Sequence, residues 1–412
     1  MKKVVITGLG AVTPIGNNVS EYWDSLINGR SGAAEITRFD ASKFKTRFAC
    51  ELKNFDPLEY IKKPEIRKYD PFIIYALAAA QQALDMSGAE SIANKHDIGV
   101  IWGTGNGGFA TFEEQVTEYV EGDGTPRFNP YFIPKTIPNM ASGIIAIKHG
   151  LTGINFTAVS ACAAANTAIM DAFNYIRWGK AKMIVTGGSE AGITPATMGG
   201  FSAMKALSTN NDNPAGACRP FDAQRDGFVM GEGAGALVLE EYEHAVARGA
   251  NIIAEVAGAA MTADAYHISA THPEGEGAAR AIELALQDAN LTAADMGYIN
   301  CHATSTPVGD LSETNAIAKV FAKHLDKIKI SATKSMTGHL LGGAGAIEAI
   351  ASILAVKNNI IPPTINTSEL DEKIPEGLNI VIGKAVEHKV NVAMSNAFGF
   401  GGHNAIVIFK KH

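Results

Sequence analysis

Two patterns of apolar residues alternate along the whole chain. Short runs rich in Val and Ile, such as Val4–Ile6 and Ile154–Val159, are typical of buried strands. Longer segments of amphipathic or small-residue character, such as Ala76–Ser87, Thr111–Val120 and Ala278–Ala289, are of helical length. The regular alternation of strands with helices predicts an α/β fold.

The second half of the chain echoes the first. A helix leads into the strand Asp97–Trp102 and a glycine loop, and later a helix leads into the strand Asp295–Asn300 and the loop Cys301–Ala303. The strand Ile328–Thr333 then precedes the small-residue helix Gly342–Ala355, as the strand Asn155–Val159 precedes the segment that begins at Cys162.

These echoes predict two α/β halves, residues 1–250 and 251–412. The boundary is expected near Gly249–Asn251, after a polar helix over Glu240–Arg248. The duplication would place Cys162 and His339 at equivalent strand-to-helix turns, where ligand sites of open α/β sheets gather.

Composition narrows the functional classes. The 412 residues are 46% hydrophobic and 19% charged, and the net charge of −7 argues against nucleic-acid binding. No stretch reaches the length of a membrane span, so no membrane association is expected. Cys50, Cys162, Cys218 and Cys301 show no CxxC spacing, which favours a reduced, cytoplasmic protein over a disulfide framework.

Cys162 is the strongest candidate nucleophile. It follows the strand Ile154–Val159 and opens a helix of very small residues, so it lies beside the positive end of that helix. This position favours the thiolate, which is the reactive form. The other three cysteines are interpreted as small buried hydrophobic residues.

Two histidines in loop-like, glycine-rich settings are candidate partners. His302 is followed by hydroxyl residues and then by Asp310 and Glu313, and His339 lies between Lys334 and Glu348. Neighbouring Lys and Glu residues can fix the tautomer and charge of a histidine. A Cys/His/His zinc site is the alternative, but no fourth ligand at metal spacing is evident, so no metal is expected.

Two glycine-rich segments carry weaker signals. The loop Gly103–Gly108 satisfies G-x-G-x-x-G, but no acidic residue follows at ribose-binding spacing, so close backbone approach is the better interpretation. The segment Asn396–Asn404 predicts a glycine-hinged aromatic loop, in which Phe400 could act as a gate and free N–H groups could form an oxyanion hole.

Taken in order, these motifs resemble the β-ketoacyl-acyl carrier protein synthases of type II fatty-acid synthesis, and most closely the synthase II branch. The resemblance runs end to end. It rests most specifically on Lys334–His339 and Phe398–Asn404, and also on Ser208–Asp212, Arg219–Asp222 with Arg225–Phe228, Asp264–His267 and Thr304–Pro307. It implies the thiolase-like fold, a duplicated α/β core in a five-layer αβαβα arrangement, usually as a homodimer.

The resemblance also implies a mechanism without metal or other cofactor. Cys162 would take an acyl group from the phosphopantetheine arm of acyl carrier protein, aided by the N–H groups of Cys162 and Phe400. His302 and His339 would stabilise the enolate formed when malonyl thioester loses CO₂, and Lys334 and Glu348 would support them. The family pattern further assigns substrate-binding positions to Thr304, Thr306, Phe398, Asn106 and Asn404.

The resemblance implies an acidic carrier, so a basic docking surface is expected; the candidates are Lys63, Arg67, Lys68, Arg127 and Lys205. The chain also departs from the family pattern. Ala303 replaces the usual Gly after the histidine, and Asn106 stands where an aliphatic residue is common. Because a buried amide needs partners, Asn106 is predicted to alter the acyl pocket.

Several alternatives share part of this pattern. A ketosynthase of a polyene or polyketide pathway would use the same Cys-His-His chemistry. A chain-length-factor subunit lacks the nucleophilic cysteine, and a thiolase uses a second cysteine near the C-terminus, but here no cysteine follows Cys301. The hypothesis of a nicotinamide oxidoreductase is supported only by the loop Gly103–Gly108. The last alternative is a protein that only binds the carrier, whose function Cys162→Ala would leave intact.

Overall fold

The computed structural model describes residues 1–412 except 90, 91 and 93. Ten strands build two matching sets. The first set is β1 (Val4–Val12), β4 (Ile98–Gly103), β5 (Asn155–Ala158), β6 (Met183–Glu190) and β7 (Gly233–Glu241). The second set is β8 (Ala254–Ala263), β9 (Tyr298–Asn300), β10 (Lys329–Ser331), β14 (Val392–Gly399) and β15 (His403–Lys410).

The remaining strands are short: β2 (Ala34–Glu35), β3 (Phe48–Ala49), β11 (Ile360–Ile361), β12 (Asn379–Ile380) and β13 (Val386–Glu387). The helices are α1 (Val19–Ile27), α2 (Lys63–Ile66), α3 (Pro71–Ser87), α4 (Phe109–Glu121), α5 (Phe132–Thr136), α6 (Met140–His149), α7 (Ala164–Arg177), α8 (Pro195–Ala203), α9 (Tyr242–Ala247), α10 (Glu276–Asp288), α11 (Pro307–Val320), α12 (Lys334–Thr337) and α13 (Ala344–Asn358).

The order of the strands shows the duplication. Hydrogen bonds link the strands in the order β12-β10-β9-β14-β15-β8-β1-β7-β6-β4-β5. If the five strands of each set are numbered in chain order, both sets have the same spatial order outward from the β1–β8 junction: first, fifth, fourth, second and third. The senses also match, because the inner pairs of each half are antiparallel and the outer pairs are parallel.

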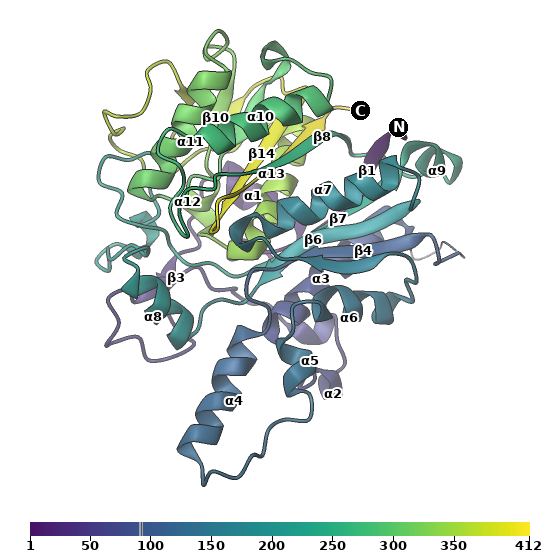
Figure 1. Ribbon diagram of the computed structural model, residues 1–412, viewed down its shortest axis with the longest axis vertical. Helices are drawn as coiled ribbons and strands as arrows, with labels where there is room; N and C mark the ends of the chain where they lie inside the picture. Colours follow the sequence, from purple (N-terminus) through teal and green to yellow (C-terminus); the bar gives the residue numbers. More distant parts are fainter. Residues whose placement is uncertain (90–91, 93) are drawn as a thin grey trace.

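Five layers result from how the helices cover these strands (Figure 1). Helices α3 and α6 pack on the first set, and α10 packs on the second set and against α11. Helices α7 and α13 contact strands of both sets, so they form the layer between them. The predicted αβαβα arrangement of a thiolase-like fold is therefore confirmed.

The helices of the middle layer begin with the same local structure. A 3₁₀ turn over Ala161–Ala163 precedes α7, and a 3₁₀ turn over Leu341–Gly343 precedes α13. Both turns open with a residue other than glycine at positive φ, 50° at Ala161 and 46° at Leu341. The structural counterpart of Cys162 is therefore Gly342. His339 lies three residues earlier, because the second half inserts α12 between its strand and its turn, which corrects the predicted equivalence of Cys162 and His339.

Three predicted boundaries were wrong for local reasons. Residues 293–295 form a 3₁₀ turn capped by Thr292, so the strand begins only at Tyr298. Glu240 and Glu241 belong to β7, which is held between β1 and β6, and the polar helix is shortened to α9. Most of the predicted C-terminal loop forms β14 and β15, so only residues 400–402 turn.

Within the described parts of the chain, no helix combines the length and apolar character needed to cross a bilayer. The described residues also contain no group of three or more His, Cys, Asp or Glu side chains placed to hold a metal ion.

Candidate active site

Cys162, His302 and His339 line one cavity of about 320 Å³, although they come from three loops of the two halves. The same cavity is lined by Phe398, Phe400 and further residues: Phe201, Lys205, Phe228, Thr304, Thr306 and Leu341. A second, polar cleft of about 600 Å³ shares none of these lining residues. The two halves thus complete one site, as expected from the strand-to-helix turns.

The environment of Cys162 differs from the sequence-based expectation. The residue is buried, with 8% of its surface exposed. Burial raises the pKa of the Cys162 thiol to about 12, while the charge of Lys334 and the backbone N–H groups of Phe400 and Cys162 lower it. The prediction of a resting thiolate was therefore wrong, because desolvation outweighs the field of the helix end.

The same two N–H groups point to an oxyanion hole. Both groups act on the Cys162 sulfur and lower the pKa of its thiol, so they could donate to the oxygen of a thioester formed on that sulfur. The hairpin tip packs tightly here, since a Cβ at Gly399 would lie 2.5 Å from the Ser160 carbonyl oxygen and 3.2 Å from the Cys162 nitrogen.

His302 belongs to a buried polar chain. The ammonium of Lys334 is ion-paired with Glu348, and its Nζ lies 3.3 Å from Nδ1 of His302. Burial, followed by the charge of Lys334 and then His339, holds the pKa of His302 well below its usual range, so the ring is neutral at pH 7. Because an ammonium can only donate, Nδ1 of His302 accepts and the ring proton resides on Nε2.

His339 is neutral for the same reason. Burial and then the charge of Lys334 hold its pKa well below the usual range. Its ring lies edge-on to that of His302, with centroids 5.2 Å apart, and to that of Phe228, at 5.3 Å. Its backbone N–H donates to Val229, and its carbonyl accepts from Gly231. The arrangement provides two neutral imidazoles on one wall of the cavity.

The sequence interpretation missed two supports of these loops. Glu190, at the end of β6, accepts hydrogen bonds from the N–H groups of Gly105, Asn106 and Gly342. Burial raises the pKa of Glu190 to about 7, although these hydrogen bonds lower it. Glu313, which was noted only as a neighbour of His302, accepts from the N–H groups of His302 and Ala303.

The loop Gly103–Gly108 has the structural role that the sequence favoured. A Cβ at Gly103 would lie 2.5 Å from the Ala164 carbonyl group, and one at Gly108 would lie 2.0 Å from the Lys135 carbonyl oxygen. The glycines therefore permit close backbone packing.

The candidate substrate contacts divide into two groups. Thr304, Thr306 and Phe398 line the cavity. Asn404 does not; its buried amide donates to Asp264 at 2.7 Å and supports the hairpin, and its contact with substrate stays a prediction. Asn106 also lies outside the lining of this cavity, and it is exposed rather than buried. Its effect on the acyl pocket stays a prediction.

The five basic candidates are spread over several elements. Lys205 is exposed and lines the mouth of the cavity. Lys63 belongs to α2, Arg67 and Lys68 follow that helix directly, and Arg127 is exposed and ion-paired with Asp123. Of the five, only Lys205 contacts the cavity.

Known proteins resemble this chain in both sequence and fold. The chain matches the beta-ketoacyl synthase N-terminal domain over residues 1–245 and the C-terminal domain over residues 253–368. It is 49% identical over 412 residues to 3-oxoacyl-[acyl-carrier-protein] synthase 2 of a Synechocystis species, covering 100% of this chain and 98% of the relative. It is 46% identical over 414 residues to the enzyme of that name from Vibrio harveyi, covering 100% and 99%.

Solved structures agree. A beta-ketoacyl synthase from Burkholderia phymatum superposes with a TM-score of 0.91 at 36% identity, with 100% of each chain covered. The ishigamide ketosynthase/chain length factor superposes with a TM-score of 0.93 at 35% identity, covering 100% of this chain and 99% of that one. Both family models and these relatives, which match along the chain that gathers Cys162, His302 and His339 in one cavity, show that the chain belongs to the beta-ketoacyl synthase family.

Proposed function

We propose that this chain is a 3-oxoacyl-[acyl-carrier-protein] synthase of fatty-acid biosynthesis. It would join malonyl-carrier protein to a Cys162-bound acyl chain with loss of CO₂, and so lengthen the chain by two carbons. The observation that carries the proposal is the single cavity that Cys162, His302 and His339 share. The identity of 46–49% to synthases of this name supports the substrate class.

The first half-reaction is acyl transfer. The Cys162 sulfur attacks the thioester carbonyl on the carrier arm, and the tetrahedral oxygen receives the N–H groups of Cys162 and Phe400. The sulfur of the arm leaves, and the proton of the cysteine thiol ends on it. A thiol of high pKa requires that this proton depart as the bond forms, since little thiolate exists beforehand.

The second half-reaction is decarboxylative condensation. The carbon–carbon bond to the carboxylate breaks, CO₂ leaves, and its electron pair forms the enolate of the carrier thioester. Neutral His302 donates from Nε2 to the enolate oxygen, and His339 is the second donor. The enolate carbon then attacks the acyl-cysteine carbonyl, and the Cys162 sulfur leaves as a thiolate to give the 3-ketoacyl carrier. A proton from water restores the Cys162 thiol.

Lys334 and Glu348 act through the histidine. Both side chains are fully buried, and their ion pair ends on Nδ1 of His302. The ammonium thereby holds the tautomer that donates into the cavity. The proposed steps use no metal or nicotinamide.

The carrier would dock on positive charge near the cavity mouth. Lys205 is the nearest candidate, and we include Lys63, Arg67, Lys68 and Arg127 as further contacts for an acidic carrier. A related structure, AntDE:AntF, holds a type II PKS acyl-carrier protein in complex with its ketosynthase, at 31% identity and a TM-score of 0.90.

A homodimer in the cytoplasm is the proposed working form. Strand β5 is an edge of the main sheet, and its first residue is exposed. Beside it Val159 is 56% exposed, and Ile147 on α6 is 74% exposed. An unpaired edge next to apolar residues is suited to pairing with a second copy. Each copy in the dimer would consist of an N-terminal half, residues 1–250, which carries Cys162, and a C-terminal half, residues 251–412.

A ketosynthase of a polyketide or polyene pathway is the second candidate. The ishigamide and AntDE ketosynthases share the fold at TM-scores of 0.93 and 0.90, but at 35% and 31% identity, below the 49% of the Synechocystis enzyme.

The test is intact-mass measurement after mixing the protein with acyl-carrier proteins of several chain lengths, followed by malonyl-carrier protein. We expect an acyl adduct on Cys162 that disappears as a 3-ketoacyl carrier two carbons longer appears. Cys162→Ala should form no adduct, whereas the matched Cys50→Ala, another buried cysteine outside the cavity, should form it. Acceptance only of partly reduced polyketide chains would favour the second candidate.

His339→Ala should separate the two half-reactions. Self-acylation is expected to persist in part, because the oxyanion hole does not include His339, while malonyl decarboxylation falls by roughly 10²-fold or more. Released CO₂ and the acyl adduct are measured on the same sample. Loss of both steps together would show that the roles are misassigned.

A further inference from the structure

The segment that presents Thr304 and Thr306 has no helix or strand to hold it. Residues 301–306 lie between β9 and α11 without regular structure, and Thr304 and Thr306 line the cavity. Ser305 between them adopts φ 67°, a conformation that residues other than glycine rarely adopt. Such a conformation persists only where the surroundings fix it, so its supports bear on the site.

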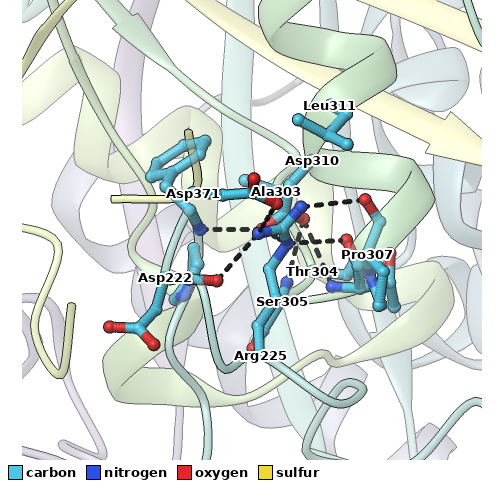
Figure 2. A network of polar contacts seen from close by, with 12 residues as sticks. Asp222, Arg225, Ala303, Thr304, Ser305, Pro307, Asp310, Leu311 and Asp371 are labelled. Atoms are coloured by element: carbon cyan, nitrogen blue, oxygen red, sulfur yellow. Dashed lines mark hydrogen bonds and ion pairs between the residues drawn. The ribbon is translucent and has the colours of Figure 1, made fainter. Parts of the chain in front are cut away.

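Arg225 is the central support (Figure 2). Its Nε donates to the carbonyl oxygen of Thr306 at 3.1 Å, and its Nη2 donates to that of Pro307 at 2.9 Å. The guanidinium therefore holds two successive carbonyl groups at the start of α11. Its side chain is 1% exposed, so these bonds form away from competing water.

The other side of the guanidinium is anchored independently of this segment. Nη1 donates to the Asp222 carbonyl oxygen at 2.7 Å and to a carboxylate oxygen of Asp371 at 2.9 Å. Asp222 in turn accepts hydrogen bonds from the N–H groups of Ser368 and Glu369. Arg225 thus ties the segment, directly through Asp371 and indirectly through Asp222, to one distant part of the chain, residues 368–371.

Asp310 is the second support of the turn that carries Thr304 and Thr306. Its Oδ1 accepts from the N–H groups of Ser305 and Thr306, at 3.1 and 3.3 Å, and its Oδ2 lies 3.5 Å from Nε of Arg225. The carboxylate holds the N–H groups of the turn, and the guanidinium holds its carbonyl groups. As a result the two threonine hydroxyls lie 3.1 Å apart at the cavity.

We propose that Arg225 is a positioning residue for the phosphopantetheine arm, which acts by fixing the turn that presents the Thr304 and Thr306 hydroxyls to the amide groups of the arm. The inference rests on the proposed function, since it needs an arm in this cavity. Arg225 does not itself line the cavity, so it affects binding only through the turn. Arginine is favoured over lysine here, because two separate nitrogens of the planar guanidinium each donate to one carbonyl, whereas lysine offers a single nitrogen.

The experiment compares an acyl group delivered with and without an arm. Acylation of Cys162 is measured with acyl-carrier protein and with a p-nitrophenyl ester of the same acyl group. For Arg225→Lys we expect KM for the acyl carrier to rise about tenfold, kcat to change less than about threefold, and acylation by the ester to be unchanged. The matched control is Arg219→Lys, because the Arg219 guanidinium donates to Gly216 and not to the turn.

A second set of variants tests whether Arg225 acts through the threonines. Adding Arg225→Lys to a Thr304→Val/Thr306→Val protein should raise KM no further than the two valines alone, since coupled residues are not additive. Multiplying effects would overturn the proposal, as would equal losses with the ester and the carrier.

Asp371→Ala removes only the outer anchor and should raise KM by roughly two- to threefold. If Arg225→Lys does not fold, this variant decides: a selective rise in KM supports the proposal, and an unchanged KM overturns it. Failure of the proposed function is distinct, because the wild-type protein would then accept the ester but not the acyl carrier.

Discussion

At the scale of single residues, burial decides the chemistry of the site. The cysteine thiol has a raised pKa and both histidines have lowered pKa values, and in all three cases desolvation is the largest cause. The resting site is therefore electrically neutral at its reacting atoms. The nearest formal charges are on the ion pair of Lys334 and Glu348, next to Nδ1 of His302.

The pH dependence of thiol reactivity follows from this. With a pKa of about 12, the thiolate fraction of Cys162 rises about tenfold per pH unit between pH 7 and 9.5. The rate of alkylation by iodoacetamide, followed on the Cys162 peptide by mass spectrometry, should show that slope. N-acetylcysteine provides the comparison, because its rate should level off near its ordinary pKa. A plateau for Cys162 already at pH 7 would contradict the expectation.

Glu348 predicts a pH dependence of stability. Burial raises its pKa to about 7, so between about pH 4.5 and 7 the folded protein holds a proton that the unfolded chain releases. Stability from this group is present below that window and is lost as pH rises through it, by about 3 kcal/mol in total.

Urea unfolding of the wild type and of Glu348→Gln at pH 5 and pH 8 measures this contribution. The difference in free energy of unfolding between the two proteins should shift by that amount against the wild type as pH rises. A difference that does not change with pH would show that Glu348 stays ionised throughout.

At the scale of elements, short connections position the site more than the helices and strands do. The hairpin between β14 and β15 turns over residues 400–402, with Gly401 at φ 87° and Gly402 at φ 78°. Only this tight turn brings the Phe400 N–H to the Cys162 sulfur. The 3₁₀ turn that contains Cys162 supplies the second N–H group.

Gly401→Ala tests the hairpin. An alanine at this φ is strained by about 1–2 kcal/mol, and relief of the strain should move the Phe400 N–H group. We expect acyl transfer to slow roughly tenfold or more, measured as the rate of adduct formation. The matched control is Gly124→Ala, which has φ 77° in an exposed loop with no neighbour within 4 Å; equal slowing in both variants would refute a local effect.

At the scale of the whole molecule, duplication places the site between the halves. Helices α7 and α13 are shared by both sets of strands, so the turns before them meet at one place. The first half contributes Cys162 to the cavity lining, and the second contributes His302, His339 and the hairpin. Because both halves line the cavity, it depends on their packing against each other.

The proposed homodimer is tested at the exposed edge. Light scattering should give twice the mass of one chain for the wild type, and Val159→Asp should shift the protein toward a single chain because it places a charge in the apolar contact. Ile268→Asp is the control and should stay dimeric, because Ile268 is an exposed apolar residue on a loop by the cavity and not at the β5 edge. A wild type with the mass of one chain would refute the proposal.

Much of the fold was predictable from neighbouring residues. Alternation of apolar runs with helical segments indicated the α/β class, and the echo of the two halves indicated the duplication that the strand order shows. The small residues after Val159 indicated a strand-to-helix turn at Cys162, and 3₁₀ and α-helical structure begin there. These signals are local, because periodicity and turn chemistry act over a few residues.

Tertiary structure alone decided the properties that depend on distant partners. The thiol pKa depends on burial beneath a hairpin more than 230 residues away, and the His302 tautomer depends on an ion pair that spans two helices. Arg225 reaches the Thr306 and Pro307 carbonyls 81 and 82 residues onward. Such contacts follow from how the layers pack, and desolvation and hydrogen-bond geometry arise only once that packing brings the groups together.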